Sequence, residues 1–512
     1  MRFLILAHLA VTVPLALLLN IWKDEAFSLF TTSGTLAETL ERSIRLELQP
    51  PVYFGLLWAW RQLDAAPLFA RFFSVACVAA ALVVVAALSR RFLPARSPAW
   101  LVGLVAFNPF TLFAALEIRI YALALLLTAV LLLCIHDAFV AERPSRYALL
   151  GVVASAVALV LTQYYAGFLL PAAAVGLVLT GRWERVRTYV LSMVAVALFL
   201  IPVGFWLPEQ FDAHIGSVTE RLSVLAAARD AAVRVEEYVL PIMRFQYELD
   251  VADTAAGRAL HWLVRLVLAG LLVAGVRTGG GLRRLVAAPE VRWLGGTTAT
   301  VGAVFVVLFM LMGPDLTQPR HTVALFLPVL LLPLLPLGRS ARPGLLAGWV
   351  AIVTVCSVGA AAFIYRPLAK SDDSARVASY LRAHAAPGEP VLLFPNDLIV
   401  PLELYDHGPA PLAPLNEPPR LDRYEPWRMA VGDTVAGAAA IAAAVAAADS
   451  AERRAGRPTG GGAVWLFAKP QDRYLGIDLG WERLEAYLAG HYRTTEEARF
   501  HGGVIVRRLV PR

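Results

Sequence analysis

The chain contains few charged residues for its length and almost no lysine, and these shortages set its class. Charged residues make up 17% of the 512 residues, whereas hydrophobic residues make up 58%. The mean hydropathy is +0.62. A soluble globular protein of this length carries more charge than that. The composition therefore predicts an integral membrane protein, and abundant Ala and Arg beside rare lysine fit a GC-rich bacterial gene.

Cysteine is scarce as well. The three cysteines, Cys77, Cys134 and Cys356, all lie inside apolar runs, a placement that supports neither a disulfide framework nor a thiolate metal site. The net charge of +7 comes mostly from arginines in short loops. We therefore interpret the charge as a mark of membrane orientation and expect no nucleic acid as a partner.

Long apolar runs dominate the first two thirds of the chain, and about eleven of them are close to membrane-spanning length. They lie roughly at residues 3–19, 67–89, 99–115, 121–140, 148–162, 166–180, 190–207, 259–276, 294–312, 321–337 and 343–365. The expected fold is a polytopic α-helical membrane protein with about 11 transmembrane helices.

Arginine clusters occupy every second loop between these runs. They are Arg90, Arg91 and Arg96; Arg143 and Arg146; Arg182, Arg185 and Arg187; Arg277, Arg283 and Arg284; and Arg339 and Arg342. Basic short loops stay in the cytoplasm. The pattern therefore predicts a multi-pass protein of the bacterial cytoplasmic (inner) membrane, with its N-terminus inside and its C-terminal domain outside. We expect the first run to be a retained helix, because no small-residue cleavage pattern follows Leu19.

Two long external loops are expected, at residues 20–66 and 208–258. The apolar stretch from Val52 to Trp60 is too short to cross the membrane. We predict that the aromatic stretch from Tyr53 to Trp60 and the region from Glu38 to Arg45 form interfacial helices in the first loop. The second loop is expected to be helical around residues 218–239.

The composition changes after Tyr365, where residues 366–512 become more charged and richer in turns. Short β-type runs at 390–394, 463–468 and 503–510 alternate with helical patterns at 375–386, 434–452 and 481–491. The sequence therefore predicts a soluble extracytoplasmic α/β domain at 366–512, following a membrane domain at 1–365. Gly460-Gly461-Gly462 precedes a strand, whereas a dinucleotide-binding loop would follow one, so a turn is expected there.

Polar clusters stand at the ends of the apolar runs, and the predicted topology puts them all on the outer side. They are Asp24-Glu25, Gln49-Pro50-Pro51, Glu117-Ile118-Arg119, Gln163-Tyr164-Tyr165 and Arg320-His321. Carboxylates, guanidinium groups and aromatic rings gathered at one membrane face indicate a site for a charged lipid substrate.

Five of these elements resemble, in the same order, the motifs of a known family. They are the acidic pair Asp24-Glu25, then Gln49-Pro50-Pro51-Val52-Tyr53, Arg71-Phe72-Phe73-Ser74, Glu117-Ile118-Arg119-Ile120-Tyr121 and Gln163-Tyr164-Tyr165. The family is the GT-C superfamily of polyprenyl-phosphate-dependent glycosyltransferases, in particular the bacterial family 39-like members related to protein O-mannosyltransferases and lipid A aminoarabinose transferases. The resemblance covers residues 1–365 and implies a GT-C fold and transfer of a sugar from a polyprenyl-phosphate donor.

The chemistry of an inverting transfer needs a base for the acceptor hydroxyl and positive charge for the departing phosphate. The resemblance makes Asp24 the general base, although a solvated acid beyond a helix end is the alternative. Glu25 is expected to hydrogen-bond acceptor or sugar hydroxyls. Glu117 is the expected second acid, although a carboxylate near the N-terminus of the next helix would also be stabilised by the helix dipole.

The remaining expected site residues serve the donor. The phosphate is assigned to Arg71, Arg119 and Arg320, because guanidinium groups bind phosphate oxygens in a bidentate way. Tyr121 is assigned to the donor as well. Sugar or lipid contact is assigned to Gln49, Tyr53, Gln163, Tyr164 and Tyr165. Arg71 and Arg320 as interfacial anchors, and the tyrosines as part of an aromatic belt, are the alternatives.

Gln49 and Gln163 stand where the family often has histidine. Glutamine is a poor ligand for transition metals. No cofactor is therefore required by the sequence, and a divalent cation, Mg²⁺ or Mn²⁺, held by the carboxylates of Asp24 and Glu117 stays open.

The expected partners are the polyprenyl-phosphate sugar donor, membrane lipids, and a glycan, lipid or protein acceptor. Two other functions compete with the transferase. A transporter or flippase of a lipid-linked sugar would need ionisable residues near the bilayer midplane and paired broken helices. Such residues are scarce in these runs. An assembly protein whose external domain binds a partner would leave the clustered loop acids unexplained.

Overall fold

The structure is a computed structural model that describes residues 1–215, 222–241, 254–312, 319–415, 421–423, 434–454, 461–474 and 477–512. The chain divides into two compact units. The first unit comprises Met1–Leu17, Gln49–Phe211 and Glu220–Ile364. The second consists chiefly of Leu18–Leu48 and Tyr365–Arg512. Leu18–Leu48, which the sequence analysis grouped with the membrane domain, thus belongs to the same unit as the C-terminal residues.

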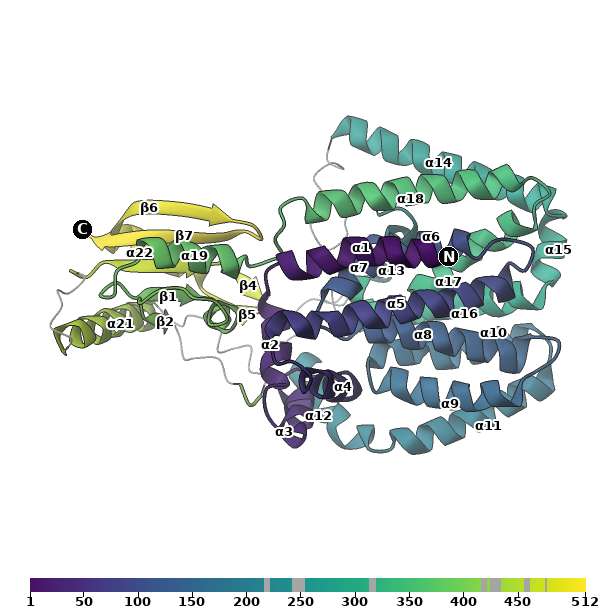
Figure 1. Cartoon of the computed structure of the whole chain (residues 1–512), viewed down its shortest axis with the longest axis horizontal. Coiled ribbons are helices and arrows are strands. Elements are labelled where there is room, and N and C mark those ends of the chain that lie inside the picture. Colours follow the sequence, from purple (N-terminus) through teal and green to yellow (C-terminus); the bar gives the residue numbers. More distant parts are fainter. Residues whose placement is uncertain are drawn as a thin grey trace. The chain divides into compact units, whose positions relative to one another are not determined.

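The first unit is entirely helical in its described part (Figure 1). Its helices are α1 (Arg2–Leu18), α4 (Val52–Arg61), α5 (Pro67–Phe92), α6 (Ala99–Ala106), α7 (Pro109–Leu116), α8 (Tyr121–Ile135), η1 (His136–Val140), α9 (Arg146–Val160), η2 (Tyr164–Phe168), α10 (Leu169–Leu179), α11 (Trp183–Leu200), α12 (Val203–Ile215), α13 (Val224–Val239), α14 (Ala255–Thr278), α15 (Gly281–Ala287), α16 (Pro289–Met312), η5 (Pro319–His321), α17 (Val323–Arg339) and α18 (Pro343–Tyr365).

All the apolar runs found in the sequence are helical, as expected. Among the described residues, five helices are long and apolar enough to cross a membrane, and up to eight crossings result if each of three bent helix pairs is one span. Three further apolar helices have 10–17 residues. The total of about eleven crossings therefore stays a prediction, whereas a polytopic helical fold with a C-terminal sheet domain is confirmed.

Small residues allow two of the helices to approach closely. α10 packs against α16 along its length. A Cβ atom added to Gly176 of α10 would lie 2.4 Å from the backbone oxygen of Trp293 in α16, and one added to Gly296 would lie 3.1 Å from the Cα of Gly176. Glycine at both positions thus removes the side chains that would separate the backbones, which is the usual device for packing helices in a membrane.

The second unit contains a mixed sheet and the first part, up to Leu48, of the loop that is predicted to be external. Its helices are α2 (Lys23–Thr31), α3 (Leu36–Arg45), α19 (Ser374–His384), η6 (Asn396–Leu398), α20 (Ile399–Leu402), α21 (Thr434–Arg454) and α22 (Trp481–His491). Its strands are β1 (Val391–Phe394), β2 (Leu412–Pro414), β3 (Val464–Ala468), β4 (Arg473–Tyr474), β5 (Ile477–Asp478), β6 (Tyr492–Phe500) and β7 (Val504–Pro511).

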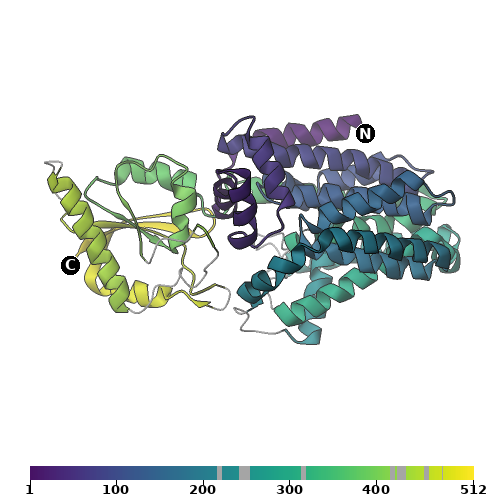
Figure 2. The same cartoon turned by 90° about the horizontal axis from the view of Figure 1, so that it is seen from below.

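Five strands form one sheet in the order β2-β1-β3-β7-β6. β1 pairs in parallel with β2 and β3, whereas β7 is antiparallel to β3 and β6. One face packs on α21 and α22, with Leu466 and Trp481 in that core. The other face packs on α19, with Val377 and Phe467 in its core. Figure 2 shows helices on both sides of the strands, as expected for an α/β layer structure.

The expected short elements are mostly present. The predicted strands correspond to β1, β3 and β7, and the predicted helices to α19, α21 and α22. The predicted interfacial helices are α3 and α4, and α13 lies within the expected helical part of the second loop. Residues 216–221 of that loop lie outside the described residues. Gly461 and Gly462 form a turn before β3, as expected.

Candidate active site

Helices of the first unit connect the polar motif segments to the arginine-rich loops. α5 carries Arg71 near its start and Arg90 near its end. α8 begins at Tyr121, and α17 follows Arg320 and ends at Arg339. Because α5 and α17 both pack on α8, the motif segments share one end of the helices and the arginine-rich loops share the other. We call residues 49–53, 71–74, 117–121, 161–165 and 319–322 the motif end, and residues 90–96, 136–146, 181–187 and 338–342 the basic end.

Two hydrogen bonds join three segments of the motif end. The side-chain Nε2 of Gln163 donates to the backbone oxygen of Arg320 at 2.9 Å. The backbone N–H of Val52 donates to the backbone oxygen of Leu161 at 3.0 Å. The element that follows Gln49 therefore lies beside the Gln163 segment, and the Gln163 segment lies beside Arg320.

A ring contact and a third hydrogen bond extend this series to the other two segments. The Tyr53 ring lies 5.9 Å from the Phe73 ring, measured between centroids. The hydroxyl of Ser74, one residue further along α5, donates to the backbone oxygen of Glu117 at 2.6 Å. Five segments that are scattered over some 270 positions of the sequence are thus joined in one continuous series.

Glu117 and Arg119 lie in the short connection between α7 and α8. Glu117 ends α7 with extended backbone and is 1% exposed, and Arg119 is 8% exposed. Tyr121 opens α8, and its ring packs against Phe113 at 5.3 Å. A carboxylate and a guanidinium group this deeply buried are expensive unless they have partners. Their burial fits a site better than a loosely solvated loop.

The break between α6 and α7 has a local cause. The two helices are bent by 61°. Pro109 starts α7, where its missing N–H costs nothing. The side-chain oxygen of Asn108 accepts from the N–H of Phe110 at 3.0 Å, and its Nδ2 donates to the backbone oxygen of Tyr238 at 2.8 Å. The break directs the end of α7, and with it Glu117, to the motif end.

Arg71, Tyr164 and Tyr165 are all anchored by protein groups. The Arg71 side chain is completely buried and donates to the backbone oxygen of Ala16 in the last turn of α1 at 2.7 Å. The Tyr164 hydroxyl accepts from the indole N–H of Trp206 at 2.8 Å. Tyr165 packs edge to face on His321 at 5.6 Å. These contacts fix the side chains, and their roles toward a substrate stay predictions.

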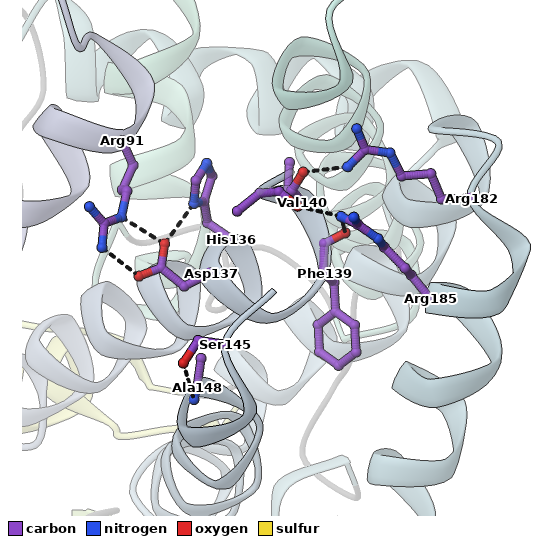
Figure 3. Close-up of polar contacts among 10 residues, drawn as sticks. Arg91, His136, Asp137, Phe139, Val140, Ser145, Ala148, Arg182 and Arg185 are labelled. Atoms are coloured by element: carbon purple, nitrogen blue, oxygen red, sulfur yellow. Dashed lines mark hydrogen bonds and ion pairs between the residues drawn. The ribbon is translucent and has the colours of Figure 1, made fainter. Parts of the chain in front are cut away.

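Arginines at the basic end bind carbonyl oxygens and the Asp137 carboxylate, as Figure 3 shows. Arg185 donates to the backbone oxygens of Phe139 at 2.9 Å and Ala141 at 2.6 Å. Arg91 forms a bidentate pair with Asp137 at 2.7 and 2.9 Å. Carbonyl groups at a helix C-terminus lack partners within the helix and carry partial negative charge. These arginines therefore have a structural task at the ends of α8 and η1.

The acidic pair Asp24-Glu25 lies in the second unit, at the start of α2. Glu25 is fully buried, with its Oε1 2.8 Å from the Lys370 ammonium and its Oε2 accepting from the backbone N–H of Trp22 at 3.4 Å. Asp24 is partly exposed. The two neighbouring carboxylates thus have different surroundings.

Lys23 belongs to the same turn. Its ammonium lies 2.9 Å from a carboxylate oxygen of Asp397, which is almost fully buried, and 5.2 Å from the centroid of the Tyr474 ring. Burial by itself lowers the pKa of Lys23, but Asp397, Tyr474, Asp372 and Asp24 outweigh it and hold the pKa above its ordinary value. Lys23 therefore carries a positive charge beside Asp24 at any physiological pH.

Sequence reasoning missed these lysine contacts. Lys23, Lys370 and Asp397 were not among the predicted site residues, because ion pairs across some 350 positions leave no local pattern. The rarity of lysine was the one available signal.

From the sequence, a divalent cation held by Asp24 and Glu117 stayed open. These two residues belong to different units. The described residues contain no group of three or more His, Cys, Asp or Glu side chains placed to hold a metal.

No protein-family model and no curated protein matches the chain. The chain is similar to the crystal structure of ArnT from Cupriavidus metallidurans in the apo state, with 14% sequence identity and a TM-score of 0.42 over 98% of this chain and 97% of that one. It is equally similar to the same protein bound to undecaprenyl phosphate, with 14% identity and a TM-score of 0.41 over the same shares. At this identity and TM-score, the likeness carries no residue role over to this chain.

Proposed function

We propose that the chain is an integral membrane glycosyltransferase that moves a sugar from a polyprenyl-phosphate donor to an acceptor on the extracytoplasmic side. The observation that carries the proposal is the continuous series of contacts at the motif end. It gathers a buried carboxylate, three arginines, glutamine and tyrosine from five separate segments at one end of the helices, opposite the basic loops. The likeness to ArnT agrees with this class of enzyme.

The proposed reaction is a single inverting displacement. The acceptor oxygen forms a bond to the anomeric carbon of the sugar while the bond from that carbon to the phosphate oxygen breaks. The acceptor proton passes to a carboxylate, for which we propose Asp24, and the polyprenyl phosphate leaves with the bonding electrons. A base held near the hydroxyl and cations held near the leaving phosphate both lower the barrier.

The residues of the motif end have corresponding roles in the proposal. Arg119 and Arg320 bind the donor phosphate, whose charge develops as the bond breaks. Glu117 orients a hydroxyl of sugar or acceptor. Gln163 is well suited to sugar, because its amide oxygen is buried and has no hydrogen-bond partner among the described residues, while its Nε2 is already used on Arg320. An amide oxygen in this state can accept from a sugar hydroxyl.

The test is transfer or slow hydrolysis of a radiolabelled polyprenyl-phosphate sugar by the purified protein in lipid nanodiscs. The wild type should release labelled sugar, and Asp24→Asn should lower the rate about a thousandfold or more, as expected for loss of a general base with its positioning. Repeating the assay with EDTA decides whether a divalent cation takes part. An active Asp24→Asn variant would remove Asp24 from the base role.

Asp64→Asn is the matched control. Asp64 lies in the same predicted external loop and is exposed, and it accepts a local hydrogen bond from the N–H of Ala66 at 2.8 Å. This variant should keep the wild-type rate. A comparable loss in both variants would point to general damage to the loop rather than to a base.

The alternative function is transport or flipping of a lipid-linked sugar, and the broken α6–α7 pair is the observation in its favour. The polar atoms of Asn108 at the break are used for capping α7 and for holding Tyr238, which favours a structural break. A transporter would move labelled lipid across a vesicle bilayer without releasing sugar, so the same labelled donor separates the two functions.

A further inference from the structure

The rare lysines of this chain are all in one place. Lysine and arginine together number 46, yet the only lysines are Lys23, Lys370 and Lys469. All three belong to the second unit, and each forms an ion pair there. Nearly all basic residues of the chain are thus arginines, and its three lysines all form ion pairs within the second unit.

The three ion pairs connect the start of α2 to the C-terminal residues. Lys370 pairs with Glu25 at 2.8 Å, and Lys23 pairs with Asp397 at 2.9 Å. Each pair joins a residue of α2 to one beyond Tyr365. Lys469 pairs at 2.6 Å with Asp372, two positions after Lys370. It therefore holds the segment that carries Lys370.

Backbone contacts strengthen the same connection. The backbone N–H of Lys370 donates to the side-chain oxygen of Asn20 at 2.6 Å. The backbone N–H of Ile21 donates to the Tyr405 hydroxyl at 2.6 Å. α2 also packs against α20. The residues on either side of Asp24 are thus attached to the C-terminal part of the unit, while Asp24 itself stays partly exposed.

Glu25 is closed to a substrate by these contacts. Its side chain is fully buried, and both of its carboxylate oxygens already have partners in Lys370 and the N–H of Trp22. A buried ion pair costs much of its own attraction in lost hydration, so it adds little net stability, but it defines one geometry because either charge alone would be strongly unfavourable.

We propose that the C-terminal domain positions the general base: the Glu25–Lys370 and Lys23–Asp397 ion pairs fix the first turn of α2 and so set the direction of Asp24. Glu25 and Lys370 are positioning residues that act through Asp24. This inference rests on the proposed function. It gives the C-terminal domain a task in catalysis. It also gives Glu25 a positioning role in place of the expected contact with substrate hydroxyls.

The test is a double-mutant cycle on full-length protein with the labelled donor. Glu25→Gln and Lys370→Met each leave one buried charge without its partner and should lower kcat about 10–100-fold, because a small misdirection of a catalytic group has effects of that size. The KM for the donor should stay within about threefold, since the change concerns the base. The double variant Glu25→Gln/Lys370→Met removes both charges and should recover most of the lost kcat.

Recovery in the double variant separates the two roles of Glu25. A glutamate that touched the substrate would leave the double variant as slow as Glu25→Gln alone, and that result would overturn the proposal, as would full activity of both folded single variants. If the single variants do not fold, the double variant decides by itself. If it also fails to fold, Lys23→Met, Asp397→Asn and their combination supply the same cycle with the partly exposed lysine.

Arg508→Met is the matched control, because Arg508 forms an ion pair with Glu389 in the same unit but on the sheet, away from α2. It should keep wild-type kcat.

Hydrogen exchange of residues 23–31 provides a readout that needs no activity. Protection of these amides should fall in Lys370→Met and return in the double variant. If the wild type transfers no sugar but the exchange pattern appears, the proposed function fails while the anchoring of α2 stands. Unchanged exchange in a folded Lys370→Met variant would refute the anchoring itself.

Discussion

The two ends of the first unit use arginine in different ways. At the basic end, arginines donate to main-chain oxygens and to Asp137, as when Arg96 binds the oxygens of Gly338 at 3.0 Å and Ser340 at 2.7 Å. At the motif end, the contacts that join successive segments come from neutral groups, namely the Ser74 hydroxyl, the Gln163 amide and backbone N–H groups. Arg71 of the motif end also binds a main-chain oxygen, that of Ala16. The difference therefore concerns the described contacts between successive motif segments, which come from uncharged groups.

The number of arginines therefore does not locate a site. Arg96, Arg182 and Arg185 of the short loops bind carbonyl oxygens near helix C-termini, a task that any helix C-terminus creates. The arginines of the motif end stand instead among a buried carboxylate and a buried glutamine. We therefore expect substitutions at the two ends to separate donor affinity from stability.

In the comparison of the two ends, the largest effect is expected at Arg320. Replacing Arg320 with alanine should raise the KM for the donor about 10–100-fold, because a charge-assisted hydrogen bond to phosphate contributes roughly 1.5–3 kcal/mol. Arg339→Ala removes an arginine from the other end of the same helix, α17, and should leave the donor KM unchanged. Equal KM values in the two variants would contradict the distinction between the ends.

The reverse pattern is expected at Arg185. Arg185→Ala removes the donors to Phe139 and Ala141 and should lower the free energy of unfolding by about 1–3 kcal/mol, since partly buried carbonyls lose their partners. Activity per folded molecule should not change. Thermal unfolding in detergent gives the comparison, with the exposed Arg187→Ala as the control. A loss of activity without a loss of stability would place a functional group at the basic end.

A smaller effect is expected where α5 meets Glu117. Ser74→Ala removes the 2.6 Å hydrogen bond to the Glu117 backbone oxygen and should lower kcat/KM about fivefold, the equivalent of roughly 1 kcal/mol. Ser89 lies in the last turn of the same helix, next to the basic end, and its buried hydroxyl has no hydrogen-bond partner among the described residues. Ser89→Ala should therefore be neutral in the same assay, and a matching loss there would show that α5 simply tolerates no change.

The sequence predicted the elements of the fold well but not all of their partners. Hydrophobic length located the membrane helices, and short apolar runs located β1, β3 and β7, because burial of these elements determines their composition. β6 was missed because most of its residues are polar and partly or fully exposed. An edge strand needs no apolar run, so its only signal is the neighbour with which it pairs.

The candidate site shows the same limit. The order of the motifs along the chain predicted which segments belong to the motif end, and the contacts from Arg320 to Glu117 join them. The attachment of Asp24 and Glu25 to Lys370 was not predicted, because periodicity and local motifs carry no information about a partner some 350 positions away. The one sequence feature that reflects this attachment is the restriction of lysine to Lys23, Lys370 and Lys469. Its meaning is clear only when the ion pairs are known.

The last and smallest effect concerns the pH dependence of the reaction, and it tests whether charge near Asp24 matters beyond position. Lys23 stays protonated because the carboxylates around it raise its pKa. The attraction between Lys23 and Asp24 is mutual, so the ammonium favours the ionised form of Asp24, and Lys23→Met should raise the pKa of Asp24. As the pH falls, Asp24 would then become protonated, and inactive as a base, at a higher pH than in the wild type. The acid limb of the kcat/KM profile should therefore move up by about half a pH unit or more.

Arg483→Met is the control, because it removes a cation of the same unit that pairs with Asp478 on an exposed surface. This variant should leave the acid limb in place. An acid limb that does not move in Lys23→Met would mean that the lysine acts through geometry alone, or that another group titrates in that limb.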